Sequence, residues 1–121
     1  MRAKQFLMWG GIILVVLALL GFVNFRIGDT LYFDSAENWA HLVLGVVALL
    51  GAFYAPADMQ RTLALVFGVV ALYFGLHGFL VMNGTAPNYY GKTNLELIDN
   101  LLHLAVGVWG LWAGMGKKSD A

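Results

Sequence analysis

The ten residues Glu37-Asn38-Trp39-Ala40-His41-Leu42-Val43-Leu44-Gly45-Val46 have a similar second copy in this sequence. They return 62 residues later as Asp99-Asn100-Leu101-Leu102-His103-Leu104-Ala105-Val106-Gly107-Val108, with the acid, Asn, His, Leu, Gly and second Val in the same places. Upstream of the two copies, Gly11 and Gly21 match Gly68 and Gly78 at an offset of 57 residues. Such self-similarity is the signature of a fold built from repeated units. We therefore expect one domain over residues 1–121, with repeats at about 6–55 and 62–115 and a polar tail at 116–121.

The composition places these repeats in a membrane. Hydrophobic residues make up 60% of the chain and charged residues 12%, against about a quarter charged in soluble domains. Four stretches of 21, 20, 30 and 17 residues carry no charge, at 5–25, 38–57, 62–91 and 100–116. A helix that spans a bilayer needs roughly 17–25 residues, and a helix satisfies its own backbone hydrogen bonds in lipid. The sequence therefore predicts four transmembrane helices.

Capping residues and a proline define the ends of these helices. Asp34 with Glu37, and Thr93 with Glu96, have the spacing of capping boxes that open the second and fourth helices. Pro56 ends the second helix, so a tight turn joins it to the third. The expected helices run over about 6–23, 35–54, 62–82 and 94–115. The fold class is an all-α membrane protein, an up-down-up-down bundle of two tandem helical hairpins.

The basic residues predict the orientation of this bundle. Five of them flank the helices on the side of the termini and two lie on the other side. The first group is Arg2, Lys4, Arg61, Lys117 and Lys118, and the second is Arg26 and Lys92. Basic residues are enriched in cytoplasmic loops, so we expect a multi-pass protein with both termini in the cytoplasm.

Two acid–histidine pairs are the candidate functional residues. Glu37 with His41, and Asp99 with His103, are four residues apart and share a helix face. Ionisable groups at membrane depth are costly and often functional. If helices two and four are diagonal neighbours, their histidines could ligate the iron of a haem, with Gly45 and Gly107 leaving room for the macrocycle. In the alternative interpretation, which we prefer, each histidine ties its own outer loop to the bundle and no ligand is bound.

Other chemistry finds little support in the sequence. The chain has no cysteine, which excludes disulfides and thiolate metal sites. Its net charge is zero, and no basic patch points to nucleic acid. Neither a Ser-His-Asp arrangement nor an H-E-x-x-H motif occurs. We therefore predict no enzymatic activity, no catalytic residues and no bound metal.

The doubled motif, Asn38-His41-Leu42-Gly45 and Asn100-His103-Leu104-Gly107, resembles that of a family of small four-helix bacterial membrane proteins classed as a domain of unknown function. The resemblance covers residues 6–115. It implies the bacterial inner membrane and the four-helix repeat fold, and it supplies no activity and no functional residues.

The leading interpretation is a non-enzymatic integral membrane protein without a cofactor. In this interpretation it is a small accessory or structural subunit of a larger membrane complex, or a homo-oligomer. The reasons are that the chain is short and that glycines lie along one face of each helix. Its expected partners are the lipid bilayer and other membrane-protein subunits or copies of itself. The alternative is a subunit of an electron-transfer or photosynthetic assembly that binds haem or chlorophyll through His41 and His103. A small transporter ranks below both, because no helix carries a charge at mid-membrane.

Overall fold

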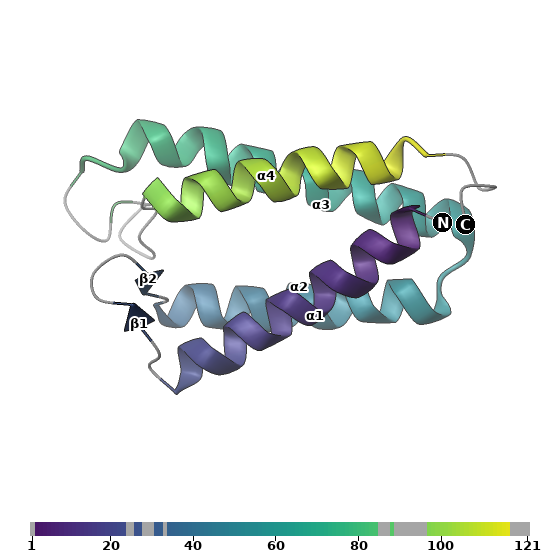
Figure 1. The fold of residues 1–121 in the computed structure, drawn as a ribbon, viewed down its shortest axis with the longest axis horizontal. Coiled ribbons are helices and arrows are strands. Elements are labelled where there is room, and N and C mark those ends of the chain that lie inside the picture. Colours follow the sequence, from purple (N-terminus) through teal and green to yellow (C-terminus); the bar gives the residue numbers. More distant parts are fainter. Residues whose placement is uncertain are drawn as a thin grey trace.

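Four long helices form the protein in its computed structural model (Figure 1), which describes residues 2–23, 26–27, 31–32, 34–84, 88 and 97–116. The helices are α1 (Arg2–Phe22), α2 (Ser35–Tyr54), α3 (Ala57–Val81) and α4 (Leu97–Gly114). Each is long and apolar enough to cross a membrane. Between α1 and α2, the two-residue strands β1 (Arg26–Ile27) and β2 (Leu31–Tyr32) pair antiparallel, with Arg26 opposite Tyr32. The four expected helices are confirmed, each with the length and apolar composition of a membrane span, and this short ladder is an addition to them.

The helix ends follow local sequence chemistry. At the start of α2, the Glu37 backbone N–H donates to Asp34 Oδ1 (2.9 Å) and the Asp34 N–H donates to Glu37 Oε2 (3.1 Å), which confirms the first capping box. Helix α2 ends at Tyr54, as expected from Pro56. Pro56 is itself the N-cap of α3, so α3 begins at Ala57 rather than near residue 62. Proline suits a helix start, where its missing N–H costs no hydrogen bond. The second capping box, at residues 93–96, lies outside the described residues.

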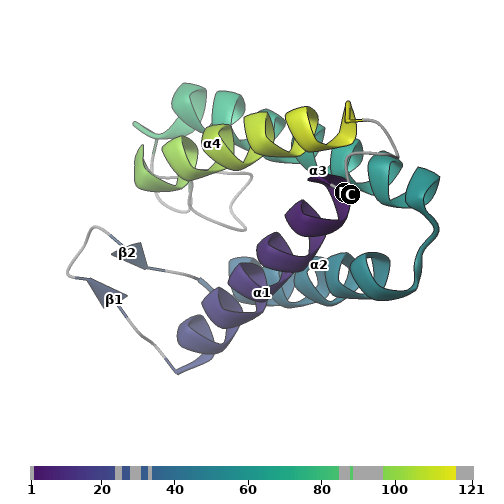
Figure 2. The same ribbon diagram turned by 45° about the vertical axis from the view of Figure 1, so that its right-hand side comes forward.

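The helices pack as two antiparallel pairs. Helix α1 packs along α2 and α3 packs along α4, whereas contacts between the pairs are fewer and fall mainly between α1 and α3. The start of α1, the end of α4 and the α2–α3 turn lie at the same end of the molecule (Figure 1). We call this the terminal end. Both views show the two pairs drawing apart toward the opposite end, where β1 and β2 lie (Figure 2); we call that the loop end.

A small apolar core joins the two pairs at the terminal end. All four helices contribute to it, through Ala3, Phe6, Leu7, Ala48, Ala52, Ala64 and Ala113. The rings of Phe6 and Trp109 meet edge to face, with centroids 4.9 Å apart, and so link α1 to α4. Many large apolar side chains cover the outside instead, such as Val43, Val108 and Leu80. This distribution suits a molecule whose solvent is lipid, because lipid tails solvate apolar side chains.

Candidate functional site

The two copies of the motif lie at the loop end, in the first turns of α2 and α4, and they bury polar side chains there. Asn38 and Asn100 keep 5% and 0% of their surface exposed. The acidic residues that precede them, Glu37 and Asp99, are buried as well. An unpaired amide or carboxylate is expensive to place in an apolar medium. The contacts of these side chains therefore decide what the motif does.

Each buried asparagine packs against a glycine on the other helix of its pair. A Cβ added at Gly21 would overlap Oδ1 of Asn38, and a Cβ added at Gly78 would overlap Oδ1 of Asn100. The amide oxygen thus occupies the space of the missing side chain, directly beside the glycine Cα. Cα–H···O contacts of this kind recur where helices approach closely. The amide nitrogen of Asn100 also donates to Sδ of Met82, 3.8 Å away on the turn that follows α3.

One turn or more below each asparagine, the backbones of the paired helices come close together. A Cβ at Gly11 would lie 3.0 Å from the Gly45 carbonyl oxygen, and a Cβ at Gly68 would lie 3.0 Å from the Gly107 carbonyl oxygen. Neighbouring side chains already fill the remaining space. Val15 Cγ2 lies 2.8 Å from the Cβ position of Gly45, and Leu72 Cγ lies 2.6 Å from that of Gly107. The space beside these two glycines is therefore occupied by helix packing rather than left open for a macrocycle.

The histidines lie half-buried at the same end of the molecule. His41 on α2 and His103 on α4 are near enough to interact electrostatically, although they belong to different helix pairs. The His103 ring lies 5.9 Å from that of Phe74, and its Nδ1 is buried without a hydrogen-bond partner among the described residues. His77 stacks on Tyr73 at 5.4 Å. The described residues hold no group of three His, Asp or Glu side chains that is arranged to bind a metal ion.

The carboxylates of the motif have their own surroundings. The Glu37 carboxylate accepts a hydrogen bond from the Asp34 backbone within the capping box, and Asp34 is the charged group whose field reaches His41. Glu37 thus stabilises the helix start, and Asp34 is an acid near enough to His41 to act on it electrostatically. Most of the outer-loop residues, to whose carbonyls the histidines were expected to donate, lie outside the described residues.

A buried glutamine at the terminal end was not predicted. Gln60, 6% exposed, donates from Nε2 to the carbonyl oxygens of Ala52 (2.9 Å) and Gly51 (3.2 Å). The last carbonyls of a helix have no partner within it, so Gln60 caps α2 from the first turn of α3. Its sequence signal is a lone amide four residues after the helix-ending Pro56, where an apolar residue would otherwise extend the core.

Comparison with known proteins is informative for the first half of the chain. Residues 1–54 match the family DUF4383, a domain of unknown function. No curated protein and no solved structure matches the chain. The matched segment ends with α2 and contains the first copy of the motif, including Asn38, His41 and Gly45. The first helix pair is therefore similar to a family whose function is itself unknown.

Proposed function

We propose that this protein is a non-enzymatic integral membrane protein of the bacterial inner membrane. In this proposal it is a small accessory or structural subunit of a larger membrane complex, or it assembles with copies of itself. The coarser statement, that four apolar helices suit a multi-pass membrane protein, follows directly from the fold. The proposal that the protein is a non-enzymatic subunit needs a reason to give the motif a structural role rather than a catalytic one.

That reason is the way in which the two buried asparagines pack against the neighbouring helices. Asn38 and Asn100 direct their amide oxygens into glycine notches on the neighbouring helix, and such contacts let small-residue faces approach closely. A polar side chain engaged in this way fixes the register of two helices. The most distinctive residues of the motif therefore have a structural use that requires no substrate.

The same contacts support the proposed repeat. Gly21 against Asn38 corresponds to Gly78 against Asn100, and Gly11 against Gly45 corresponds to Gly68 against Gly107. These correspondences use the offsets of 57 and 62 residues that the sequence alone suggested. We infer that α1–α2 and α3–α4 are tandem copies of one hairpin. The basic residues of the terminal end support the further proposal that both termini face the cytoplasm.

A second candidate function is tetrapyrrole binding through His41 and His103. The surroundings of His103 favour it. Its Nδ1 is a buried nitrogen without a hydrogen-bond partner among the described residues. His41, on the other helix pair, lies near enough to interact with it electrostatically. Since Val15 and Leu72 fill the space beside Gly45 and Gly107, a flat ligand would have to lie between the two helix pairs rather than between the helices of one pair.

Two measurements on the protein extracted in a mild detergent test these proposals. Native mass spectrometry should find the 13.2 kDa chain in an assembly with other subunits or with copies of itself, and a monomer alone would contradict the leading proposal. An absorption spectrum of the same sample should show no Soret band. Haem or chlorin at one molecule per chain, lost in His103→Ala, would instead establish the second candidate.

A further inference from the structure

The outward side of α3 carries two polar aromatic rings. Tyr73 and His77 are four residues apart, and their rings stack with centroids 5.4 Å apart and planes inclined by 19°. Tyr73 is exposed, as are the apolar residues before and after it on this side of the helix. At 3.6 residues per turn, this side points away from the buried glycines of α3 that pack against α4. We call it the outer face of α3, and it consists of Val69, Tyr73, Leu76, His77 and Leu80.

Tyr73 lies at hydrocarbon depth rather than at the membrane interface. It precedes Val81, the end of α3, by eight residues, which is about 12 Å along the helix axis. With 25 residues, α3 is about 37 Å long, so when centred in a hydrocarbon core of about 30 Å each end extends only about 4 Å beyond it. By contrast, the exposed Trp112 is two residues from the end of α4, where the Arg2 guanidinium covers its ring with Cζ 4.1 Å from the centroid. Lipid tails offer a polar ring no hydrogen-bond partner, so a protein surface suits the position of Tyr73 better.

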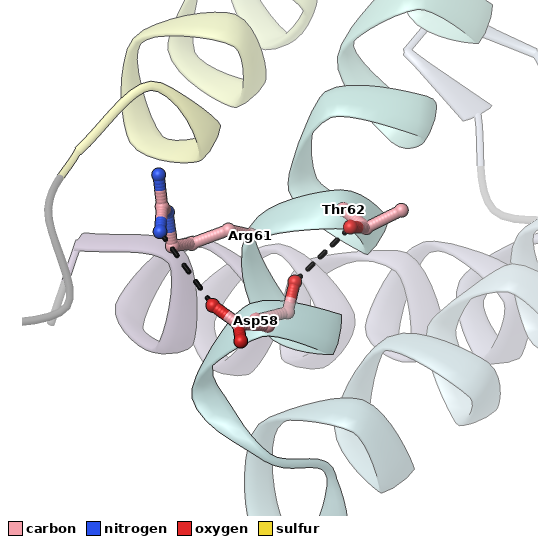
Figure 3. Close-up of polar contacts among 3 residues, drawn as sticks. All are labelled: Asp58, Arg61 and Thr62. Atoms are coloured by element: carbon pink, nitrogen blue, oxygen red, sulfur yellow. Dashed lines mark hydrogen bonds and ion pairs between the residues drawn. The ribbon is translucent and has the colours of Figure 1, made fainter.

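The other polar side chains on the exposed part of α3 gather at its start. There Arg61 Nη1 lies 3.7 Å from Asp58 Oδ1, and the Thr62 hydroxyl donates to the Asp58 carbonyl oxygen at 3.0 Å (Figure 3). After Arg61, the sequence carries no charged residue until Lys92. The outer face is therefore uncharged, and two copies of it can meet without the cost of opposing like charges.

The first hairpin lacks these rings. At the offset of 57 residues, Val16 and Leu20 of α1 stand where α3 has Tyr73 and His77. The glycines and asparagines that pack the hairpins occur in both copies, so a hairpin of this kind forms without the polar rings. The rings thus distinguish the outside of α3 from the equivalent side of α1, which indicates a contact that only α3 makes.

We propose that the outer face of α3 is the interface between two copies of this chain, related by a twofold axis along the membrane normal. The proposal rests on the proposed function in its second form, assembly with copies of itself. Around such an axis residues of equal depth meet, so the rings of one copy face the same rings of the other. A hydroxyl and an imidazole each have more than one hydrogen-bonding site, so bonds within the chain and bonds to the second copy can coexist. Hydrogen bonds of this kind hold transmembrane helices together.

Disulfide cross-linking in this cysteine-free chain tests the interface. Leu76→Cys places a thiol on the outer face, and Leu19→Cys is the matched control, because it replaces the same residue type at the corresponding position of α1 with a similar exposure (57% against 62%). After oxidation of native membranes with copper phenanthroline, Leu76→Cys should give a band at twice the 13.2 kDa mass of one chain. The control should give little of it. Equal cross-linking of the two variants would overturn the proposal.

The role of the polar rings is tested by giving α3 the residues of α1. Tyr73→Val with His77→Leu should weaken the dimer about tenfold, the effect of losing two interhelical hydrogen bonds in lipid, measured from the dimer fraction in native mass spectra as detergent is added. Unchanged dimerisation would contradict the proposal. Circular dichroism checks the fold, and if the double variant does not fold, Tyr73→Phe should still weaken the dimer about threefold; wild-type dimerisation of that variant would also contradict it.

Two results separate this interface from the proposed function. A cross-link from Leu76→Cys to a different, larger protein would place another subunit on the outer face, which excludes a second copy there and leaves the role as a subunit intact. A wild-type homo-oligomer in native mass spectra without a cross-link at Leu76→Cys would likewise reject this interface alone. A wild-type monomer would reject both.

Discussion

Replacing Gly78 with alanine tests the contact between the asparagines and the glycines. The added Cβ would overlap the amide of Asn100, which is fully buried and therefore has no free volume in which to move. Overpacking of this kind typically costs about 1–3 kcal/mol. In a helix interior, alanine is also more favourable than glycine by about 1 kcal/mol, so the two effects oppose each other in this variant.

Gly10→Ala separates the two effects. Nothing lies within 4 Å of a Cβ at Gly10, so this control gains helix propensity without a clash. The free energy of unfolding, measured by titration with SDS in mild detergent and followed by circular dichroism, should therefore be about 1–3 kcal/mol lower for Gly78→Ala than for Gly10→Ala. The difference between the two variants measures the packing at Gly78.

Asn100→Ala should abolish that difference, because it removes the group that the new methyl meets. The double-mutant cycle of Gly78→Ala with Asn100→Ala should show a coupling within the range of about 0.5–3 kcal/mol found for residues in contact. Equal stability of Gly78→Ala and Gly10→Ala, or a cycle without coupling, would refute the proposed packing. Gly21→Ala with Asn38→Ala should behave alike if the two helix pairs are copies.

Three further predictions concern other parts of the bundle. Gln60→Ala should lower the free energy of unfolding by about 1–3 kcal/mol, because it removes the side-chain donor from buried carbonyl oxygens. Gln5→Ala, on the exposed side of α1, should change this free energy little. Equal effects of the two substitutions would contradict the capping role of Gln60. The effects of His41→Ala and His103→Ala on unfolding should add within about 0.3–0.5 kcal/mol if each histidine acts alone, and a coupling well above about 1 kcal/mol would indicate a shared ligand or direct contact. In this cysteine-free chain, a cysteine at Met59 should react with an impermeant maleimide only after spheroplasts are opened and one at Asn83 should react before; the reverse pattern would invert the proposed topology.

The sequence predicted the number of helices, the first capping box and the turn at Pro56, because each depends on a short run of residues. The helix boundaries were harder to predict where a helix extends beyond its apolar run through polar and charged residues. Helix α1 begins at Arg2, four residues before the apolar run that marks it in the sequence. Helix α3 begins at Ala57 because Pro56 can serve as a cap as well as a stop.

The candidate site was less predictable than the helices. Asn38 and Asn100 stood out by repetition, but their contacts with Gly21 and Gly78 depend on how two helices rotate against each other. No single-helix pattern contains that information. The same applies to Gln60, whose partners lie on the preceding helix, and to Arg2 and Trp112, which are separated by most of the chain. The restriction of the apolar core to the terminal end follows from the divergence of the helix pairs, which the sequence does not encode locally.

Packing mainly within the two helix pairs has a consequence for biosynthesis. Once Tyr54 has emerged from the ribosome, α1 and α2 can close their Gly11–Gly45 and Gly21–Asn38 contacts without waiting for the rest of the chain. We therefore expect the nascent protein to enter the membrane as two successive hairpins, each with its asparagine already packed against the glycine of its neighbouring helix. The last assembly step is then the docking of preformed hairpins through Phe6, Trp109 and the alanines of the terminal end.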